Sequence, residues 1–437
     1  MLKQQTPASN SLWLVAEKVV FLVISFGVNL LLARHLQPAL FGTLSFLLAG
    51  VSVLMPIMAL GLNSLVTREL LRRPSHGATI LGSAIGLRLM MGLLVAVAAL
   101  VMGQHLLSPG NWVLFSLLVV ASVSQGFFVI DFWLQAHSAN RHGVMARLAV
   151  LLLLSIARLT AIYLSAGIDI FVYLLCAEWL LLAFAYARVY RRHGAPLNTL
   201  TFSGLESKKL FSEGRWLWFT AIAAILALKI DQLMLAYLVN DQAVGIYAAA
   251  VRLSEVWYLL PVALMTGYFP KLMAAKQAGS AEYLHLLQRL CDILFCAGIA
   301  VAALITLTAD QLVPLLYGQA YIQSVEVLVL HVWAGVFFFT AALVNRWLLI
   351  ENALAAAFYV QAAGAIANIC LNLWLIPNYG VVGAAVATLL SAMVSGYVVL
   401  LLHPRLHPMA RIMSLSLCLP LRIAHRLYTA NSFKLRK

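Results

Sequence analysis

Residues Leu228 to Lys271 read LKIDQLMLAYLVNDQAVGIYAAAVRLSEVWYLLPVALMTGYFPK. They predict two long apolar helices joined by a short polar turn at Asn240-Asp241-Gln242. Each arm is long enough to cross the hydrocarbon core of a membrane, which takes about 20 residues. The stretch is therefore a transmembrane hairpin.

The same hairpin carries four charged residues, Lys229, Asp231, Arg252 and Glu255. Charge at membrane depth is costly, so such side chains normally face the interior of a helix bundle or a water-filled cavity. A membrane hairpin with ionisable groups inside it indicates a transport path.

An earlier stretch repeats part of this pattern. Leu32-Ala33 and Gly42 have the same spacing as Leu235-Ala236 and Gly245, each pair in a helix–turn–helix. Many transporters are built from internal repeats of this kind, although two apolar helices can also match by chance.

The composition of the whole chain fits a membrane protein. Of its 437 residues 63% are hydrophobic and only 10% are charged, whereas soluble domains are about 25% charged. The net charge of +14 does not indicate nucleic-acid binding, because the basic residues lie at helix ends, as the positive-inside rule expects. The fold class expected is an all-α polytopic membrane protein with two six-helix lobes around a central cavity.

The apolar runs predict twelve membrane helices. Their approximate ranges are 12–33, 40–65, 79–102, 112–135, 144–166, 168–189, 214–239, 244–270, 287–308, 322–349, 354–377 and 380–402.

Every second connection between these helices is basic, which places those connections and both termini in the cytoplasm. The basic residues concerned are Arg68, Arg72 and Arg73, then Arg141 and Arg147, then Arg191, Arg192, Lys208, Lys209 and Arg215, then Lys271 and Lys276.

Four parts of the chain follow from this count. Residues 1–190 form an N-terminal lobe, 191–213 a basic cytoplasmic linker, 214–402 a C-terminal lobe and 403–437 a basic tail. The linker is either a flexible connection that lets the lobes rock or an ordinary loop. The tail either lies on anionic lipid, as basic amphipathic segments do, or is a cytoplasmic extension without fixed structure.

Several motifs resemble one family. They are IDQLMLAYLVNDQAVGIYAAAVRLSEVWYLLPVAL at 230–264, ARHLQPALFGTLSF at 33–46, IDFWLQA at 130–136, LLYGQAY at 315–321 and NICLNLWLIPNYGVVGAAVAT at 368–388. In this order they resemble Wzx-type polysaccharide flippases of the multidrug/oligosaccharidyl-lipid/polysaccharide exporter superfamily, over residues 12–402.

The resemblance implies a function. Such a protein moves an undecaprenyl-diphosphate-linked oligosaccharide across the bacterial inner membrane by alternating access, for O-antigen, lipopolysaccharide or exopolysaccharide synthesis. Its partners would be the lipid-linked substrate, membrane lipids, H⁺ or Na⁺ and the polysaccharide polymerase machinery. The alternatives are an ion-coupled multidrug/cation antiporter of the same superfamily and a lipid-linked peptidoglycan-precursor flippase.

The substrate's diphosphate would need fixed cations in the cavity. Arg88, Arg158, Lys229 and Arg252 are the candidates, because each lies within a predicted membrane helix and arginine suits phosphate oxygens. The alternative is that each reaches the interface or pairs with a nearby acid.

Acids and prolines in the predicted helices complete the candidate set. Asp231, Glu255 and Glu178 could carry protons or sodium, or could neutralise the cations. Pro56 and Pro261 could act as hinges for alternating access, or as static kinks.

The sequence indicates no enzyme, cofactor or metal site. It has no GxSxG, Walker loop or HExxH motif. Its five cysteines are scattered, without the spacing of a zinc site.

Overall fold

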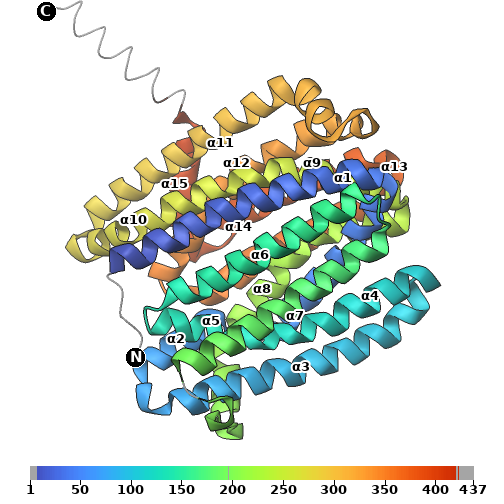
Figure 1. The fold of residues 1–437 in the computed structure, drawn as a ribbon. Helices are drawn as coiled ribbons and strands as arrows, with labels where there is room; N and C mark the ends of the chain where they lie inside the picture. Colours follow the sequence, from blue (N-terminus) through green and yellow to red (C-terminus); the bar gives the residue numbers. More distant parts are fainter. Residues whose placement is uncertain (1–6, 195, 420–421, 423–437) are drawn as a thin grey trace, which may run out of the picture. The chain divides into compact units, whose positions relative to one another are not determined.

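The computed structural model describes residues 7–194, 196–419 and 422, and in this part of the chain every regular element is a helix (Figure 1). The α-helices are α1 Pro7–Ala59, α2 Asn63–Arg72, α3 Gly77–Leu106, α4 Pro109–Ser122, α5 Val129–Ala136, α6 Asn140–Tyr163, α7 Ile168–His193, α8 Gly204–Leu238, α9 Asp241–Glu255, α10 Leu259–Ala278, α11 Ser280–Tyr317, α12 Ser324–Ile350, α13 Leu354–Met393, α14 Val399–Leu402 and α15 His407–Leu417.

Ten helical segments of the described chain are long and apolar enough to span a membrane. Two of them contain a break. In α1 the backbone of Gln37 leaves the helical conformation (φ 60°), because the proline that follows disfavours it. In α13 Gly380 adopts φ 55° and ψ −130°, which glycine tolerates best. Each break divides one segment into two passes, so the described residues contain the twelve passes that the sequence predicts.

Some predicted boundaries are wrong. The predicted helix 40–65 ends at Ala59, where Leu60 and Gly61 take positive φ values and turn the chain into α2. The predicted helix 244–270 is divided by a 3₁₀ turn at Val256–Tyr258 into α9 and α10. These turns lie inside apolar sequence, so hydropathy alone cannot mark them.

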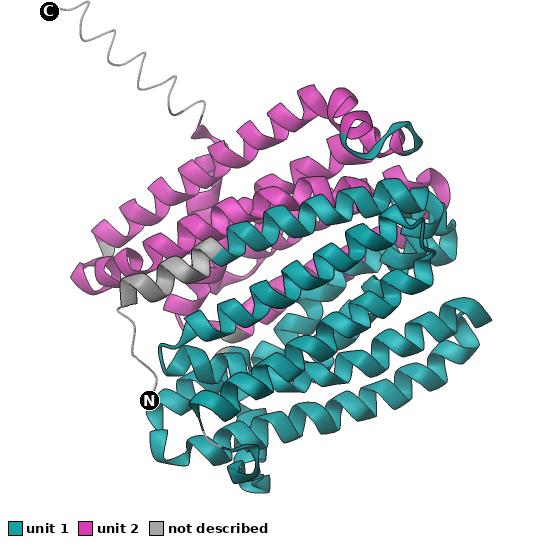
Figure 2. Ribbon diagram, in the orientation of Figure 1, with its two compact units in different colours: residues 1–246, 316–320 teal, residues 247–315, 321–437 magenta. Residues whose placement is uncertain are grey.

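The chain groups into two compact units (Figure 2). Unit 1 comprises residues 1–246 and 316–320, and unit 2 comprises residues 247–315 and 321–437. Helix α8 belongs to the predicted C-terminal lobe, but within unit 1 it packs against α1 and α3. In unit 2 the helix α15 packs into the hydrophobic core through Met409, Ile412 and Met413. The predicted tail thus begins as a packed helix, and its residues 420–421 and 423–437 lie outside the described part.

The two repeated glycines of the sequence contact each other inside unit 1. A Cβ on Gly42 would lie 1.7 Å from the carbonyl oxygen of Asp241, and a Cβ on Gly245 would lie 1.9 Å from that of Pro38. The Thr43 hydroxyl donates a 2.5 Å hydrogen bond to the Asp241 carboxylate beside this crossing. Small residues let membrane helices approach closely. Here each of the two glycines makes room for the backbone of the segment that carries the other.

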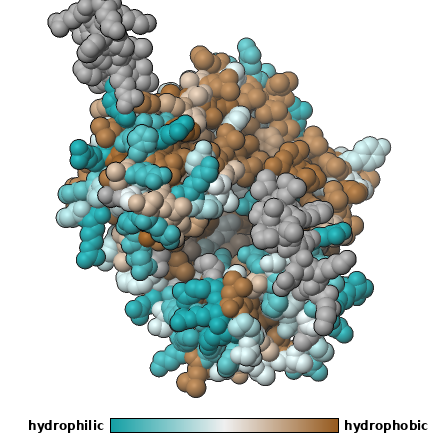
Figure 3. Space-filling model, turned by 90° about the vertical axis from the view of Figure 1, so that its left-hand side faces the viewer, coloured by the Kyte–Doolittle hydropathy of each residue, from teal (hydrophilic) through white to brown (hydrophobic). Residues whose placement is uncertain are grey.

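A cluster of charged residues ties the start of α8 to α2. The Glu69 carboxylate, whose side chain is 1% exposed, lies 2.7 Å from Arg73 and 3.4 Å from Lys209. Arg73 also bonds Glu206 at 2.5 Å, and Arg68 bonds Glu213. Residues 204–213 of the predicted linker are therefore a helix end held by ion pairs. Figure 3 views the molecule from the side on which α2 lies in Figure 1, and hydrophilic residues cover much of that face.

Opposing effects act on the pKa of Glu69. Burial alone would raise it, but the hydrogen bond from Arg73 and the positive charges of Lys209 and Arg73 outweigh burial and hold the pKa below its ordinary value. The ionised carboxylate therefore stabilises the fold.

Gly42→Ala or Gly245→Ala should destabilise the protein strongly. Overpacking costs about 1–3 kcal/mol, and we expect the upper end because the added Cβ would meet backbone atoms. Thermal unfolding of the purified protein in detergent measures the effect. Gly27→Ala on α1 is the control, since nothing lies within 4 Å of its added Cβ. Equal melting temperatures for all three variants would contradict the close crossing.

Glu69→Gln should lower the melting temperature at neutral pH. We expect a loss of about 1–3 kcal/mol, less than the ~3–5 kcal/mol of a fully buried pair, because Arg73 and Lys209 stay partly exposed. Since the folded pKa is lowered, this stabilisation is present above the unfolded value of about 4.3 and disappears as pH falls through the folded pKa. Melting curves recorded from about pH 3 to about pH 7 should show that the melting temperatures of the two proteins converge in acid. Glu282→Gln, an exposed acid of α11, should have no effect at any pH.

Candidate substrate path

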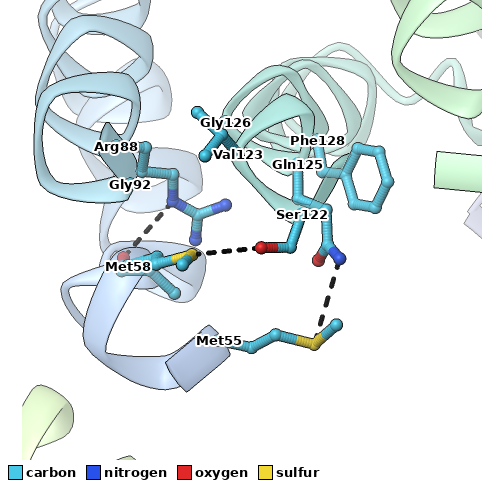
Figure 4. Close-up of a pocket in the computed structure, with 10 residues that line it drawn as sticks. Met55, Met58, Arg88, Gly92, Ser122, Val123, Gln125, Gly126 and Phe128 are labelled. Carbon is cyan, nitrogen blue, oxygen red and sulfur yellow. Dashed lines mark hydrogen bonds between the residues drawn. The ribbon is translucent and has the colours of Figure 1, made fainter. Parts of the chain in front are cut away.

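Arg88 lies on α3 in unit 1 and is only 7% exposed (Figure 4). Its Nε donates to the Ala59 carbonyl at 3.3 Å, and its Nη2 donates to the Asn63 side chain. The guanidinium also lies over the Phe132 ring, 5.7 Å from the centroid. Ala59 is the last residue of α1, so Arg88 places a positive charge at the negative end of that helix. The geometry makes Arg88 a cap for the α1–α2 turn.

A small cavity of about 50 Å³ lies beside Arg88 (Figure 4). Ser122 and Gln125 line it and donate hydrogen bonds to the sulfur atoms of Met58 and Met55, at 3.6 and 3.9 Å. A water molecule needs roughly 10–15 Å³ of such volume. The cavity therefore accommodates a few waters and is too small for a sugar diphosphate.

Arg158 on α6 and Glu178 on α7 form an ion pair in unit 1. Their side chains are 13% and 20% exposed, so protein atoms cover most of the pair. The sequence proposed Arg158 as a diphosphate ligand and Glu178 as an ion-coupling acid. The structure joins them, as the pairing alternative expected.

Arg147 is a half-buried centre of ion pairs that the sequence did not predict. It bonds both oxygens of Glu17, the Asp131 carboxylate at 2.5 Å and the Tyr186 hydroxyl at 2.7 Å. One side chain thus links α1, α5, α6 and α7. The sequence counted Arg147 among the basic residues of a connection, although the predicted helix 144–166 includes it, and the structure places it in α6, which begins at Asn140. The signal available in the sequence was the presence of two acids, Glu17 and Asp131, in other apolar segments.

Lys229 and Asp231 both lie in α8, deep in unit 1. Asp231 is 2% exposed. Lys229 is half-buried and forms no ion pair with any residue that the structure describes. Of the four cations that the sequence proposed, Lys229 is therefore the one in unit 1 without a bond to another described side chain.

Arg252 and Glu255 lie in the last turns of α9, in unit 2, and both are half-buried. Next to them Ser254 forms a 2.6 Å hydrogen bond with Nδ1 of His331, which lies on α12 and is 3% exposed. The ring of Tyr247 packs edge-on against His331 and its hydroxyl bonds Thr388 at 2.9 Å. The sequence missed this polar group, although His331 interrupts an apolar run.

The two candidate hinge prolines lie at ends of helices. Pro56 is in the last turn of α1, three residues before Ala59. Pro261 is in the first turn of α10, directly after the 3₁₀ turn at Val256–Tyr258. Proline is tolerated in a first turn because its missing N–H has no helical partner there.

Metal ligands do not converge in the described residues: no group of three or more His, Cys, Asp or Glu side chains there could hold an ion. The five cysteines are free.

The sequence profile of one family matches residues 8–273, more than half of the chain. The chain belongs to the polysaccharide biosynthesis protein family. The chain is 24% identical over 257 residues to the probable flippase AglR of Haloferax volcanii, a match that covers 55% of this chain and 50% of that protein. The chain thus matches about half the length of that relative.

Solved structures share the fold of this polysaccharide biosynthesis protein. An inward-facing multidrug resistance transporter of the MATE family, in the MOP superfamily, is 13% identical with a TM-score of 0.74, over 90% of this chain and 95% of that one. The lipid II flippase MurJ in an inward closed conformation is 14% identical with a TM-score of 0.65, over 93% of each chain. At these identities the likeness concerns the fold. It confirms the all-α polytopic architecture, and the family match together with the flippase relative confirms the resemblance that the motifs indicated.

The Arg158–Glu178 pair should behave as a coupled structural unit. Arg158→Ala alone leaves a buried carboxylate unpaired and should destabilise the protein, whereas the double change to Ala should restore part of the loss. A double-mutant cycle of thermal unfolding should give a coupling of about 0.5–3 kcal/mol. Additive effects of the two single changes would contradict the pair. Arg188→Ala serves as the control. Arg188 is a basic residue elsewhere on α7, and neither Arg158 nor Glu178 forms an ion pair with it in the described structure.

Proposed function

We propose that the protein is a flippase that moves an undecaprenyl-diphosphate-linked oligosaccharide from the cytoplasmic to the periplasmic leaflet of the bacterial inner membrane. Membership of the polysaccharide biosynthesis protein family supports the substrate class. The fold shared with MOP superfamily transporters supports alternating access. The observation that carries the proposal is Lys229, a half-buried cation in a membrane helix that forms no ion pair with a described residue.

The physical argument concerns dehydration of the diphosphate. A charged head group leaves water when it enters the protein. This costs on the order of several kcal/mol per ion unless fixed charges of opposite sign replace the hydration shell. Lys229 on α8 would supply such a charge in unit 1, and Arg252 on α9 is the candidate of unit 2. Arg88 and Arg158 would contribute only by exchanging their present bonds to Asn63 and Glu178 for bonds to phosphate.

The same proposal covers ion coupling and the orientation of the protein in the membrane. Asp231, Glu255 and Glu178 are the acids that would carry H⁺ or Na⁺, and Glu178 would first have to leave its ion pair with Arg158. The basic connections support a cytoplasmic position for both termini. The polymerase machinery of the same pathway would take over the glycan in the periplasm.

A second candidate function is a multidrug/cation antiporter. Two observations favour it, the TM-score of 0.74 to a MATE transporter and the deeply buried carboxylate of Asp231. A cationic drug would use Asp231, whereas a glycolipid diphosphate would use Lys229. A peptidoglycan-precursor flippase, suggested by the likeness to MurJ, shares the diphosphate and differs only in the sugar.

Lys229→Ala should lower glycolipid transport about tenfold, which corresponds to about 1.4 kcal/mol, while Lys229→Arg should retain most of it. The measurement is leaflet translocation of labelled undecaprenyl-diphosphate oligosaccharide in proteoliposomes. Arg252→Ala should lower transport in the same direction. Lys208→Ala, an exposed lysine of the same helix α8, is the matched control.

The same vesicles separate the two functions. A pH gradient and a sodium gradient are applied in turn. An organic cation is offered as a second cargo beside the labelled glycolipid. Glycolipid movement without cation movement supports the flippase, and the effective gradient identifies the coupling ion. Cation movement alone, blocked by Asp231→Asn and unaffected by Lys229→Ala, would reassign the protein to the antiporters.

A further inference from the structure

Unit 1 contains an apolar pocket of about 310 Å³ that the transport proposal does not use. Helices α1, α3, α4 and α8 form its walls. Leu47 and Ala99 are buried at its base, 1% and 8% exposed, whereas Met102 and Tyr237 at its rim are 61% and 57% exposed. The pocket is therefore open on one side of unit 1, within segments that span the membrane.

The wall chemistry excludes a polar ligand group. Of the described residues that line the pocket, Tyr237 alone carries a polar side-chain group. Hydrocarbon is the chemistry that such a wall accepts, since a polar group placed there would lose its hydrogen bonds. Because the walls lie at membrane depth, the ligand is the chain of a lipid.

The ring of Phe115 on α4 fills the space beside two glycines of the wall. It lies 3.1 and 3.4 Å from the positions of the missing Cβ atoms of Gly50 on α1 and Gly103 on α3. Bulky apolar side chains lie one turn before and one turn after Gly50, at Phe46 and Leu54. The wall is therefore apolar on α1, α3 and α4 alike, as a hydrocarbon chain requires.

A cation lies on α8 one helical turn beyond the pocket residue Leu233. Lys229, Leu233 and Tyr237 are spaced four residues apart on α8, so they share one helix face. Leu233 and Tyr237 line the pocket, and Lys229 lies about 12 Å deeper along the helix than Tyr237, at 1.5 Å per residue. The helix face therefore presents hydrocarbon near one membrane surface and positive charge towards the middle of the membrane.

We infer that this pocket holds part of the isoprenoid chain of the lipid carrier while Lys229 binds its diphosphate. The inference rests on the proposed function and names the part of the substrate that the charged residues do not bind. In this arrangement the chain occupies the predicted periplasmic half of the membrane and the head group lies near the middle. That is the position of a lipid drawn inward from the cytoplasmic leaflet.

Photolabelling tests the occupant directly. The probe is a polyprenyl diphosphate with a diazirine at the chain terminus, added to the full-length protein in vesicles of phosphatidylethanolamine and phosphatidylglycerol. After irradiation, the label should appear on peptides that contain Met102 or Phe115. Excess unlabelled polyprenyl diphosphate should remove the label, and excess dioleoyl phosphatidylglycerol should not.

A matched pair of variants tests the role in transport. Ala99→Phe fills the base of the pocket and should lower both labelling and glycolipid transport at least tenfold. Ala98→Phe changes the neighbouring exposed residue of α3 and should change neither. Should Ala99→Phe fail to fold, Gly103→Val narrows the same pocket with a smaller volume change and is expected to act in the same direction.

Three results would overturn the inference. They are labelling outside the pocket, equal competition by phosphatidylglycerol, or wild-type transport by a folded pocket-filling variant. A wild-type protein that moves no glycolipid at all would instead refute the proposed function, so the two failures are distinguishable.

Discussion

The reciprocal contact of Gly42 and Gly245 is the constraint on which the arrangement of unit 1 depends. Each glycine leaves no room for a Cβ because a carbonyl oxygen of the other segment occupies that space. The two segments come from different halves of the chain, so the contact joins sequence-distant helices within unit 1. It also explains why α8, from the second half, packs with α1 in unit 1.

Charge inside unit 1 is mostly neutralised within the protein. Arg147 binds Glu17 and Asp131, Arg158 binds Glu178, and Arg88 satisfies the end of α1. Such bonds make buried charge tolerable but leave little of it available to a ligand. Lys229 differs because no described residue neutralises it. The contrast separates cations that hold helices together from a cation that can change partners during transport.

The sequence predicts the helix number and the fold class because long apolar runs leave few alternatives in a membrane. It also indicates the family, through motifs spread along the chain. It does not predict the turns at Leu60 and Val256, since both lie inside apolar runs and arise from tertiary packing. Nor does it predict that Arg158 meets Glu178, because pairing across helices depends on their rotation, which hydropathy does not encode.

Helix α8 is one unbroken element from Gly204 to Leu238, about 52 Å long at 1.5 Å per residue. Its first turns are bound through Glu206 and Lys209 to the charges of α2, and Lys229 lies towards its other end. One continuous helix thus joins the ion cluster to Lys229, which lies about 30 Å beyond Lys209 at 1.5 Å per residue. The same helix packs against α1 and α3, so contacts with two other helices as well as surface ion pairs fix the position of Lys229.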